Sequence, residues 1–140
     1  MTDKRLFMLN GLIAAGYGIA LLVAADPILD RYGITPNPEG VYMGRWFGLG
    51  LLAIGLLTWL ARDAGASDGG QAIAQALTVT YTIGVALALW GTLFGPFNAL
   101  GWIAVGLNLL LGSGFAYAQL TNAQDHVGPA DLSGRSAPQA

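Results

Sequence analysis

Four largely apolar runs, each roughly twenty residues long, constrain this chain more than any other feature. They cover residues 6–25, 41–61, 71–93 and 99–120. As an α-helix rising about 1.5 Å per residue, a run of that length crosses a hydrocarbon core of about 30 Å. Lipid offers the backbone no partner, so each segment must satisfy its own amide groups. The pattern predicts an all-α, polytopic membrane protein with four transmembrane helices in an antiparallel bundle.

Composition agrees with a chain that is solvated by lipid. Hydrophobic residues make up 54% of the sequence and charged residues only 10%, whereas soluble domains carry about 25% charge. The 21 glycines favour membrane helices as well. A net charge of −2 without a basic patch argues against nucleic-acid binding. The lack of cysteine excludes disulfides and thiolate chemistry.

The first apolar run invites comparison with a cleaved signal peptide. Lys4 and Arg5 would form its basic start, and residues 23–25 would pass as a cleavage site. The run is longer, however, than the apolar region of about 7–15 residues that signal peptides contain. We therefore expect a retained helix.

The connection after the first run has the composition of a short helix and a turn. Asp26 and Pro27 suit the N-cap and first position of a helix, and Gly33 suits the position that ends one. The segment would place Ile28 and Leu29 on one face, as in an amphipathic helix lying on the membrane surface. We predict this interfacial helix between the first two spans.

The remaining boundaries follow from polar and helix-breaking residues. Asp68 is expected to cap the third span, and Gly95 and Pro96 to end it. Residues 1–120 would form the four-helix domain. Residues 121–140 are polar and without periodicity, which predicts a disordered C-terminal tail.

Basic residues near the spans indicate an orientation. Lys4, Arg5 and Arg62 fall on one side of the predicted membrane, and Arg31 and Arg45 on the other. Because cytoplasmic loops carry the excess of Lys and Arg, both termini are predicted to be cytoplasmic.

Arg45 is the sharpest candidate for a functional side chain. It lies about one turn inside the second span, where an unpaired charge is costly. It could bind a lipid headgroup, a carboxylate or a phosphate. The structural alternative is an arginine that reaches to the interface or pairs with Asp26, Asp30 or Glu39.

A second candidate is a set of polar side chains near the middle of the spans. They could line a cavity for a quinone, a lipid or another small amphiphile: Tyr17, Thr80, Tyr81, Thr82 and Asn108. The structural alternative is hydrogen bonding between helices or back to the same helix. A further polar group is interpreted as interfacial: Asn10, Gln71, Gln75, Tyr117 and Gln119.

Small residues mark the predicted helix-packing faces. Gly44 and Gly48 have the small-xxx-small spacing that lets a second backbone approach closely. Gly106, Gly112 and Ala116 are the corresponding candidates in the fourth span. A homo-oligomer could also form through Gly44 and Gly48, or through Gly112 and Ala116.

The sequence lacks the residues that several kinds of chemistry require. No Asp or Glu lies inside a span, which disfavours a transporter coupled through membrane carboxylates. His126 stands alone in the predicted tail, so no metal site is predicted. No nucleophile–base set or phosphate-binding loop is present, so we expect no enzyme.

Three stretches carry a resemblance: DPILDRYGI (26–34), GRWFGLGLLAIGLLTWLARD (44–63) and NALGWIAVGLNLLLGSGFAYAQL (98–120). Together they resemble a broad group of small four-helix bacterial inner-membrane proteins of uncharacterised function. The resemblance implies a multi-pass protein of the bacterial cytoplasmic membrane and carries no activity with it.

The sequence thus favours a non-catalytic accessory or scaffolding subunit. It would pack against other membrane proteins, or against itself, through its glycine-rich helix faces. The alternative is a bundle that binds a lipid, a quinone or a small amphiphile, or a passive transport element, using Arg45 and the mid-membrane polar set. No cofactor is predicted beyond such a bound lipid or quinone.

Overall fold

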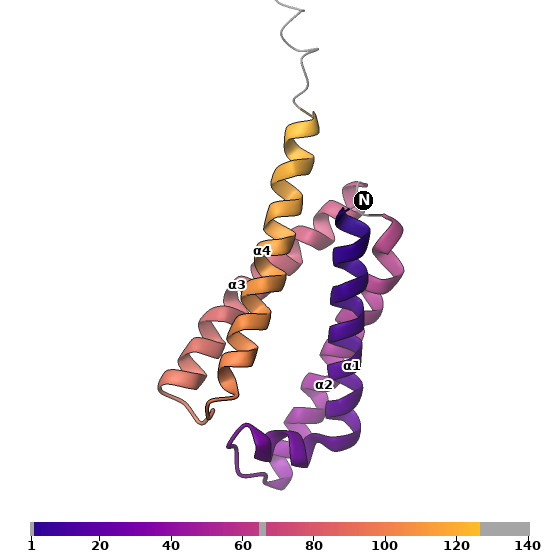
Figure 1. The fold of residues 1–140 in the computed structure, drawn as a ribbon. Coiled ribbons are helices and arrows are strands. Elements are labelled where there is room, and N and C mark those ends of the chain that lie inside the picture. The colour runs from indigo at the N-terminus through magenta and orange to yellow at the C-terminus, as the bar shows by residue number, and fades with distance from the viewer. Residues whose placement is uncertain (1, 65–66, 127–140) are drawn as a thin grey trace, which may run out of the picture.

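The computed structural model describes residues 2–64 and 67–126, and within them every long element is a helix (Figure 1). The elements are, in order, α1 (Thr2–Arg31), α2 (Pro38–Leu60), the 3-10 turn η1 (Ala61–Asp63), α3 (Asp68–Leu93) and α4 (Gly101–His126). Four helices are long and apolar enough to cross a membrane. The chain therefore has the all-α architecture of a multi-pass membrane protein, as the sequence predicts.

A kink divides α1. Ala24 has the non-helical angles φ −133° and ψ 45°, and helix resumes on its far side through Arg31. Pro27 lies in the first turn after the kink, where its missing N–H costs no helical hydrogen bond. The predicted short helix after Asp26 is present as this second segment of α1. Its position on a membrane surface stays a prediction.

Gly33 ends α1 as the sequence indicates. Its φ of +85° lies in the left-handed region, which glycine adopts without strain. Its N–H donates to Asp30 O at 2.9 Å, and the N–H of Ile34 donates to Leu29 O at 3.1 Å. These two bonds form the Schellman pattern, which satisfies carbonyls that the last helical turn leaves free.

The other helix ends depart from the prediction by a few residues. The cap of α3 is Ser67, whose Oγ accepts from Gly70 N at 3.1 Å, and Asp68 falls in the first turn instead. Asp68 is wrong as the cap because the residue before it already has the extended backbone and the hydroxyl that a cap needs. At the other end, α4 continues through His126. Residues 127–140 of the predicted tail lie outside the described residues.

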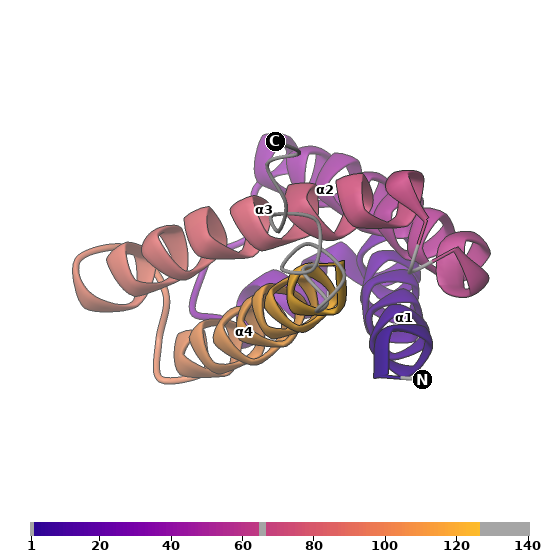
Figure 2. The same cartoon turned by 90° about the horizontal axis from the view of Figure 1, so that it is seen from above.

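The helices are packed in two pairs. α1 lies along α2, and α3 lies along α4, each pair joined by a short connection (Figures 1 and 2). The two pairs meet through a smaller contact between α1 and α4. The N-terminal end of α1 and the C-terminal end of α4 lie at the same end of the molecule (Figure 1). A closed antiparallel bundle of all four helices stays a prediction.

Small residues set the distance between α1 and α2. A Cβ added at Gly18 would lie 2.6 Å from the backbone nitrogen of Leu52, and one at Gly48 would lie 2.8 Å from Leu21 Cβ. A Cβ at Gly55 would overlap the backbone of Ala15. The two backbones are therefore in direct contact, as small-xxx-small packing requires.

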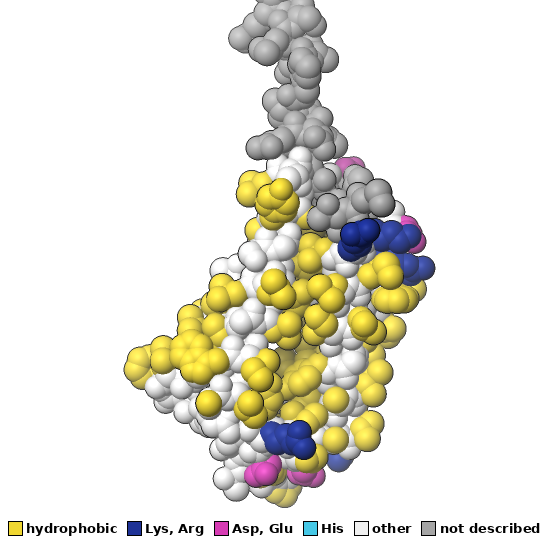
Figure 3. Space-filling view, in the orientation of Figure 1, with side chains coloured by type: hydrophobic (Ala, Val, Ile, Leu, Met, Phe, Trp, Pro, Cys, Tyr) yellow, Lys and Arg dark blue, Asp and Glu magenta, His cyan; other side chains and the backbone are white. Residues whose placement is uncertain are grey.

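The charged side chains that the structure describes lie toward the two ends of the molecule. Figure 3 shows basic and acidic side chains at either end and a hydrophobic surface between them. One end carries Lys4, Arg5, Arg62, Asp63 and Asp68, and the other carries Asp26, Asp30, Arg31, Glu39 and Arg45. Exposed leucine, isoleucine and tryptophan side chains cover the surface between them. An apolar belt between two polar ends matches a bilayer.

Candidate functional site

The two helix pairs meet at the side chain of Asn10. This residue of α1 is fully buried, and its Nδ2 donates to Thr58 Oγ1 of α2 at 3.3 Å. Its Oδ1 accepts a hydrogen bond from the hydroxyl of Tyr81 in α3. One amide thus joins three helices.

Aromatic side chains surround this polar contact. Phe7 meets Phe115 of α4 edge-on, with ring centroids 5.5 Å apart. The ring of Tyr81 stacks on the ring of Phe115, with centroids 6.3 Å apart and an interplanar angle of 10°. Phe7 and Phe115 also belong to the buried core cluster with Ala74 and Leu77. The hydrogen bonds of Asn10 therefore lie beside the hydrophobic core of the molecule.

Gln119 of α4 makes a separate set of hydrogen bonds to α3. Its Nε2 donates to Thr78 Oγ1 at 2.6 Å and to Ala74 O at 3.2 Å, both in α3. We call Asn10, Thr58, Tyr81, Thr78 and Gln119 the polar junction. Its bonds run from α2 through α1 to α3, and from α4 to α3.

The sequence interpretation of Asn10 as interfacial is wrong, because the structure buries it between helices. The spacing of Asn10 from apolar residues of the same helix was a sign of this burial. Asn10 follows Phe7 by three residues and precedes Ala14 by four, which puts all three on one helix face. Phe7 and Ala14 are buried. The sequence did not reveal which other helices that face would meet.

The polar side chains of the junction bond to one another and to backbone carbonyl groups. Thr58 Oγ1 also donates to Ile54 O at 2.9 Å. Among the described residues, no buried side-chain nitrogen or oxygen lacks a hydrogen-bond partner. A fully satisfied network holds helices together and orients them. These side chains therefore serve as cross-links between helices.

The mid-membrane polar set does not gather at one point. Thr80 and Thr82 are exposed and donate to Ala76 O and Thr78 O of their own helix, both at 2.8 Å. Asn108 donates to Ala104 O at 2.7 Å and lies against Gly84. Tyr17 is partly exposed on α1. Only Tyr81 of this set belongs to the junction, and ligand binding by the set stays a prediction.

Arg45 is exposed on the first part of α2. The ion pairs of the described residues join Lys4 to Asp63 at 2.6 Å and Arg62 to Asp63 at 3.6 Å, both at the opposite end. Tyr42 and Trp46, one turn before and one residue after Arg45, pack edge-on with centroids 6.2 Å apart. Arg45 thus lies beside an aromatic pair of the kind found at membrane interfaces.

The predicted packing residues have different surroundings. Gly44 and Gly48 are buried and face α1. Gly112 faces Tyr81 of α3, and Ala116 is partly buried. A Cβ added at Gly106 would have no atom within 4 Å. Gly44 and Gly48 of α2 thus serve contacts inside this chain, while Gly106 lies on its outer surface.

A second junction joins the connections at the opposite end. Asn98, between α3 and α4, donates from its backbone to Tyr32 O at 2.9 Å and from Nδ2 to Arg31 O at 2.8 Å. Phe97 packs edge-on against the ring of Tyr32, with centroids 5.9 Å apart. The two helix pairs are therefore tied at both ends.

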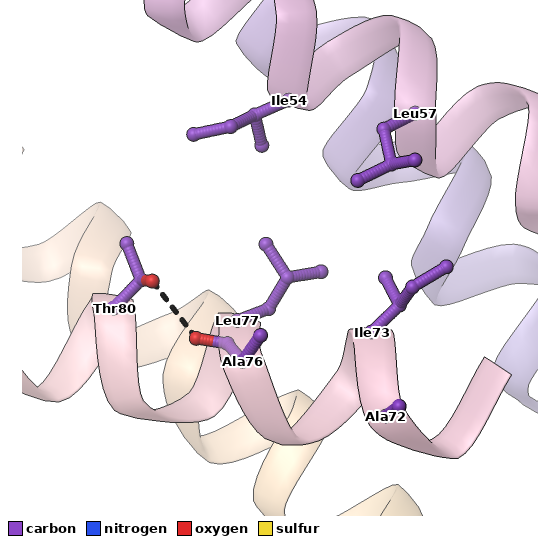
Figure 4. A pocket seen from close by; sticks show the side chains of 7 residues that line it. All are labelled: Ile54, Leu57, Ala72, Ile73, Ala76, Leu77 and Thr80. Atoms are coloured by element: carbon purple, nitrogen blue, oxygen red, sulfur yellow. Dashed lines mark hydrogen bonds between the residues drawn. The ribbon is translucent and has the colours of Figure 1, made fainter. Parts of the chain in front are cut away.

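An apolar groove separates α2 from α3. It has a volume of about 350 Å³ and is lined by Ile54, Leu57, Ala72, Ile73, Ala76, Leu77 and Thr80. Figure 4 shows Ile54 and Leu57 facing Leu77 and Ile73 across the open space. The hydroxyl of Thr80 is bonded to Ala76 O, so the lining presents hydrocarbon. We call this the α2–α3 groove.

Within residues 2–64 and 67–126, no group of three or more His, Cys, Asp or Glu side chains could hold a metal ion. Comparison with protein-family models, with curated proteins and with solved structures gives no match. Function is therefore inferred from the geometry of this chain.

Proposed function

We propose that this chain is a non-catalytic accessory or scaffolding subunit of a bacterial cytoplasmic membrane. The proposal rests on the hydrogen bonding of the polar junction. Asn10, a fully buried amide, uses its donor on Thr58 and its acceptor on Tyr81. Side chains used in this way contribute packing and rigidity and are not free for acid–base work.

Outward-facing small residues support contacts with other membrane proteins. Gly16, Gly50 and Gly106 have no atom of this chain within 4 Å of the position that a Cβ would take. At such positions a neighbouring helix can come close in lipid. The partners we propose are other membrane proteins or a second copy of the chain.

The proposed membrane arrangement is an antiparallel four-helix bundle with both termini in the cytoplasm. Lys4, Arg5 and Arg62 at one end support this orientation. The segment between the kink at Ala24 and the stop at Gly33 would lie on the outer surface as the interfacial helix.

Extraction from native membranes in mild detergent, with mass spectrometry of all co-purifying proteins, tests the role. We expect a stoichiometric larger complex that Gly106→Leu weakens, because the added side chain occupies an outer contact. Ser113→Leu, another exposed position of α4, is the matched control. Recovery of the chain alone, in the wild type and both variants, would contradict the subunit role.

The second candidate is a protein that binds a lipid, a quinone or another small amphiphile. Arg45 favours it, because this side chain is exposed beside Tyr42 and Trp46 and pairs with no carboxylate among the described residues. The same preparation tests this candidate. One enriched amphiphile that Arg45→Gln releases would support it.

A further inference from the structure

The two helix pairs form a V whose apex lies at the polar junction. α1 and α4 approach each other near the N-terminal end of α1 and diverge toward the opposite end of the molecule (Figures 1 and 2). At the apex Phe7 meets Phe115, and a Cβ added at Gly114 would lie 3.0 Å from Leu6 Cδ1. On the side of α2 and α3, the α2–α3 groove separates the pairs. The contact between the pairs is therefore small and concentrated at the apex.

The segment after the kink of α1 turns toward the α3–α4 connection at the open end of the V (Figure 1). We call residues 25–34 the strap. A Cβ added at Gly44 of α2 would lie 3.6 Å from Ala25 Cβ and 3.5 Å from Leu29 Cδ1, so the strap packs on α2. The non-helical backbone of Ala24 separates it from the rest of α1. The strap is thus fixed to the first helix pair.

The α3–α4 connection is fixed to the second helix pair through Phe97. Its ring lies beside Gly91, where a Cβ would come within 2.7 Å of two ring carbons. Its N–H donates to Gly91 O at 3.1 Å. A Cβ added at Gly101, the first residue of α4, would lie 3.0 Å from Phe97 Cβ. Phe97 therefore contacts both helices of its pair.

The contacts that join the strap to this connection lie at the surface of the molecule. Asn98 donates from its backbone to Tyr32 O at 2.9 Å and from Nδ2 to Arg31 O at 2.8 Å. Asn98 and Arg31 are exposed, whereas Asn10 at the apex is fully buried. Because water competes for exposed hydrogen bonds, these contacts open more readily than those of the apex.

We propose that the strap is a latch, held by Asn98, whose release lets the two helix pairs spread at the open end while the polar junction serves as the pivot. Units of one chain that share a small interface move relative to each other. From Asn10 to Ala24, α1 extends about 21 Å. A rotation of about 15° at the pivot would therefore move the open end by about 5 Å. This motion does not depend on the proposed subunit role.

Hydrogen exchange of the wild-type protein in nanodiscs, resolved by residue with NMR, tests the latch through two neighbouring amides. The N–H of Asn98 bonds across the pairs to Tyr32 O, and that of Phe97 bonds within its own pair to Gly91 O. After correction for intrinsic rates, we expect the Asn98 amide to exchange about tenfold faster than the Phe97 amide, or more. Equal protection of both would overturn the proposal, because the strap would then separate only when the connection unfolds.

Distances between spin labels test the spreading of the pairs, and the chain has no cysteine of its own to interfere. Val23→Cys on α1 with Ile103→Cys on α4 reports on the open end. Leu9→Cys with Tyr117→Cys reports on the region near the apex. All four side chains are exposed. Double electron–electron resonance in nanodiscs measures both distances with the latch intact and with the latch weakened.

Asn98→Asp weakens the latch without removing the start of α4. It keeps the Oδ1 that accepts from Leu100 N, and it places a carboxylate oxygen against Arg31 O in place of the amide donor. We expect the distance at the open end to lengthen by about 5 Å and the distance near the apex to stay the same. Asn37→Asp is the matched control, because this cap of α2 accepts only from Gly40 N of its own pair.

An unchanged distance at the open end of Asn98→Asp, or equal lengthening at both positions, would overturn the proposal. The first result would show that Asn98 does not hold the pairs together, and the second that the polar junction is not the pivot. Where Asn98→Asp does not fold, the exchange of the wild-type Asn98 and Phe97 amides decides the matter.

Discussion

The side-chain oxygen of Asn10 accepts a hydrogen bond from the hydroxyl of Tyr81, 71 positions further along the chain. The same amide donates to Thr58, so that it joins the two helices of one pair to a helix of the other. In a membrane, polar bonds of this kind replace much of the hydrophobic drive that holds helices together in water. The polar junction thus holds the two helix pairs together, and the proposed scaffolding role rests on it.

Asn10→Leu should destabilise the protein while keeping the volume of the side chain nearly constant. The variant removes both bonds of the amide and leaves the Tyr81 hydroxyl without its acceptor. We expect a loss of about 1 kcal/mol in the free energy of unfolding. Reversible unfolding in mixed micelles, followed by circular dichroism, measures it. Thr82→Val is the control, since that hydroxyl is exposed and bonds only its own helix.

Gly55→Ala should separate α1 from α2. The new methyl group would overlap the backbone of Ala15, which cannot move aside as a flexible side chain could. The expected loss is about 1–3 kcal/mol. Gly50→Ala is the matched control on the same helix, where no atom lies within 4 Å of the added carbon. Thermal unfolding in detergent compares the two, and equal behaviour would show that α1 and α2 are not in direct contact.

Much of the fold could be predicted because lipid leaves the chain few choices. The apolar runs predicted the four helices, since length and hydropathy alone decide whether a segment can cross a membrane. The Gly33 stop could be predicted because only glycine adopts its φ of +85° without strain. The predicted cap of α3, Asp68, lies one residue beyond the actual cap, Ser67, because both side chains accept hydrogen bonds equally well.

Gly33→Ala should weaken the end of α1 and its contact with the α3–α4 connection. An alanine at φ +85° carries a steric cost of about 1–2 kcal/mol. Gly33→Asn should cost less, because asparagine tolerates the left-handed region. Hydrogen exchange of the amides of Gly33 and Ile34 checks this. Faster exchange in the alanine variant than in the asparagine variant is the expected order, and the reverse order would contradict the Schellman stop.

The proposed orientation can be tested by labelling, because the chain has no cysteine of its own. Thr35→Cys lies in the α1–α2 connection, and Ser67→Cys lies at the start of α3. In intact cells stripped of their outer membrane, a membrane-impermeant maleimide should label the first and reach the second only after lysis. Labelling in the opposite pattern would place the termini outside.

The candidate site is less accessible to sequence reasoning than the fold. Arg45, Tyr17 and Asn108 stand out because polar side chains are unusual in spans, yet their depth along a helix does not say which face they occupy. The sequence favours an interfacial Asn10 because this residue lies near the start of its span. Its partners Thr58 and Tyr81 come from two other helices. Only the arrangement of the helices brings these side chains together.

A double-mutant cycle between Asn10 and Tyr81 tests most directly whether these side chains hold the helices together. The cycle combines Asn10→Leu with Tyr81→Phe and measures the free energy of unfolding of each variant. We predict a coupling of about 0.6 kcal/mol or more, the size of hydrogen bonds between membrane helices. The pair Asn10→Leu and Thr82→Val should be additive. Additivity within about 0.3 kcal/mol for Asn10 and Tyr81 as well would contradict a cross-linking role for the polar junction.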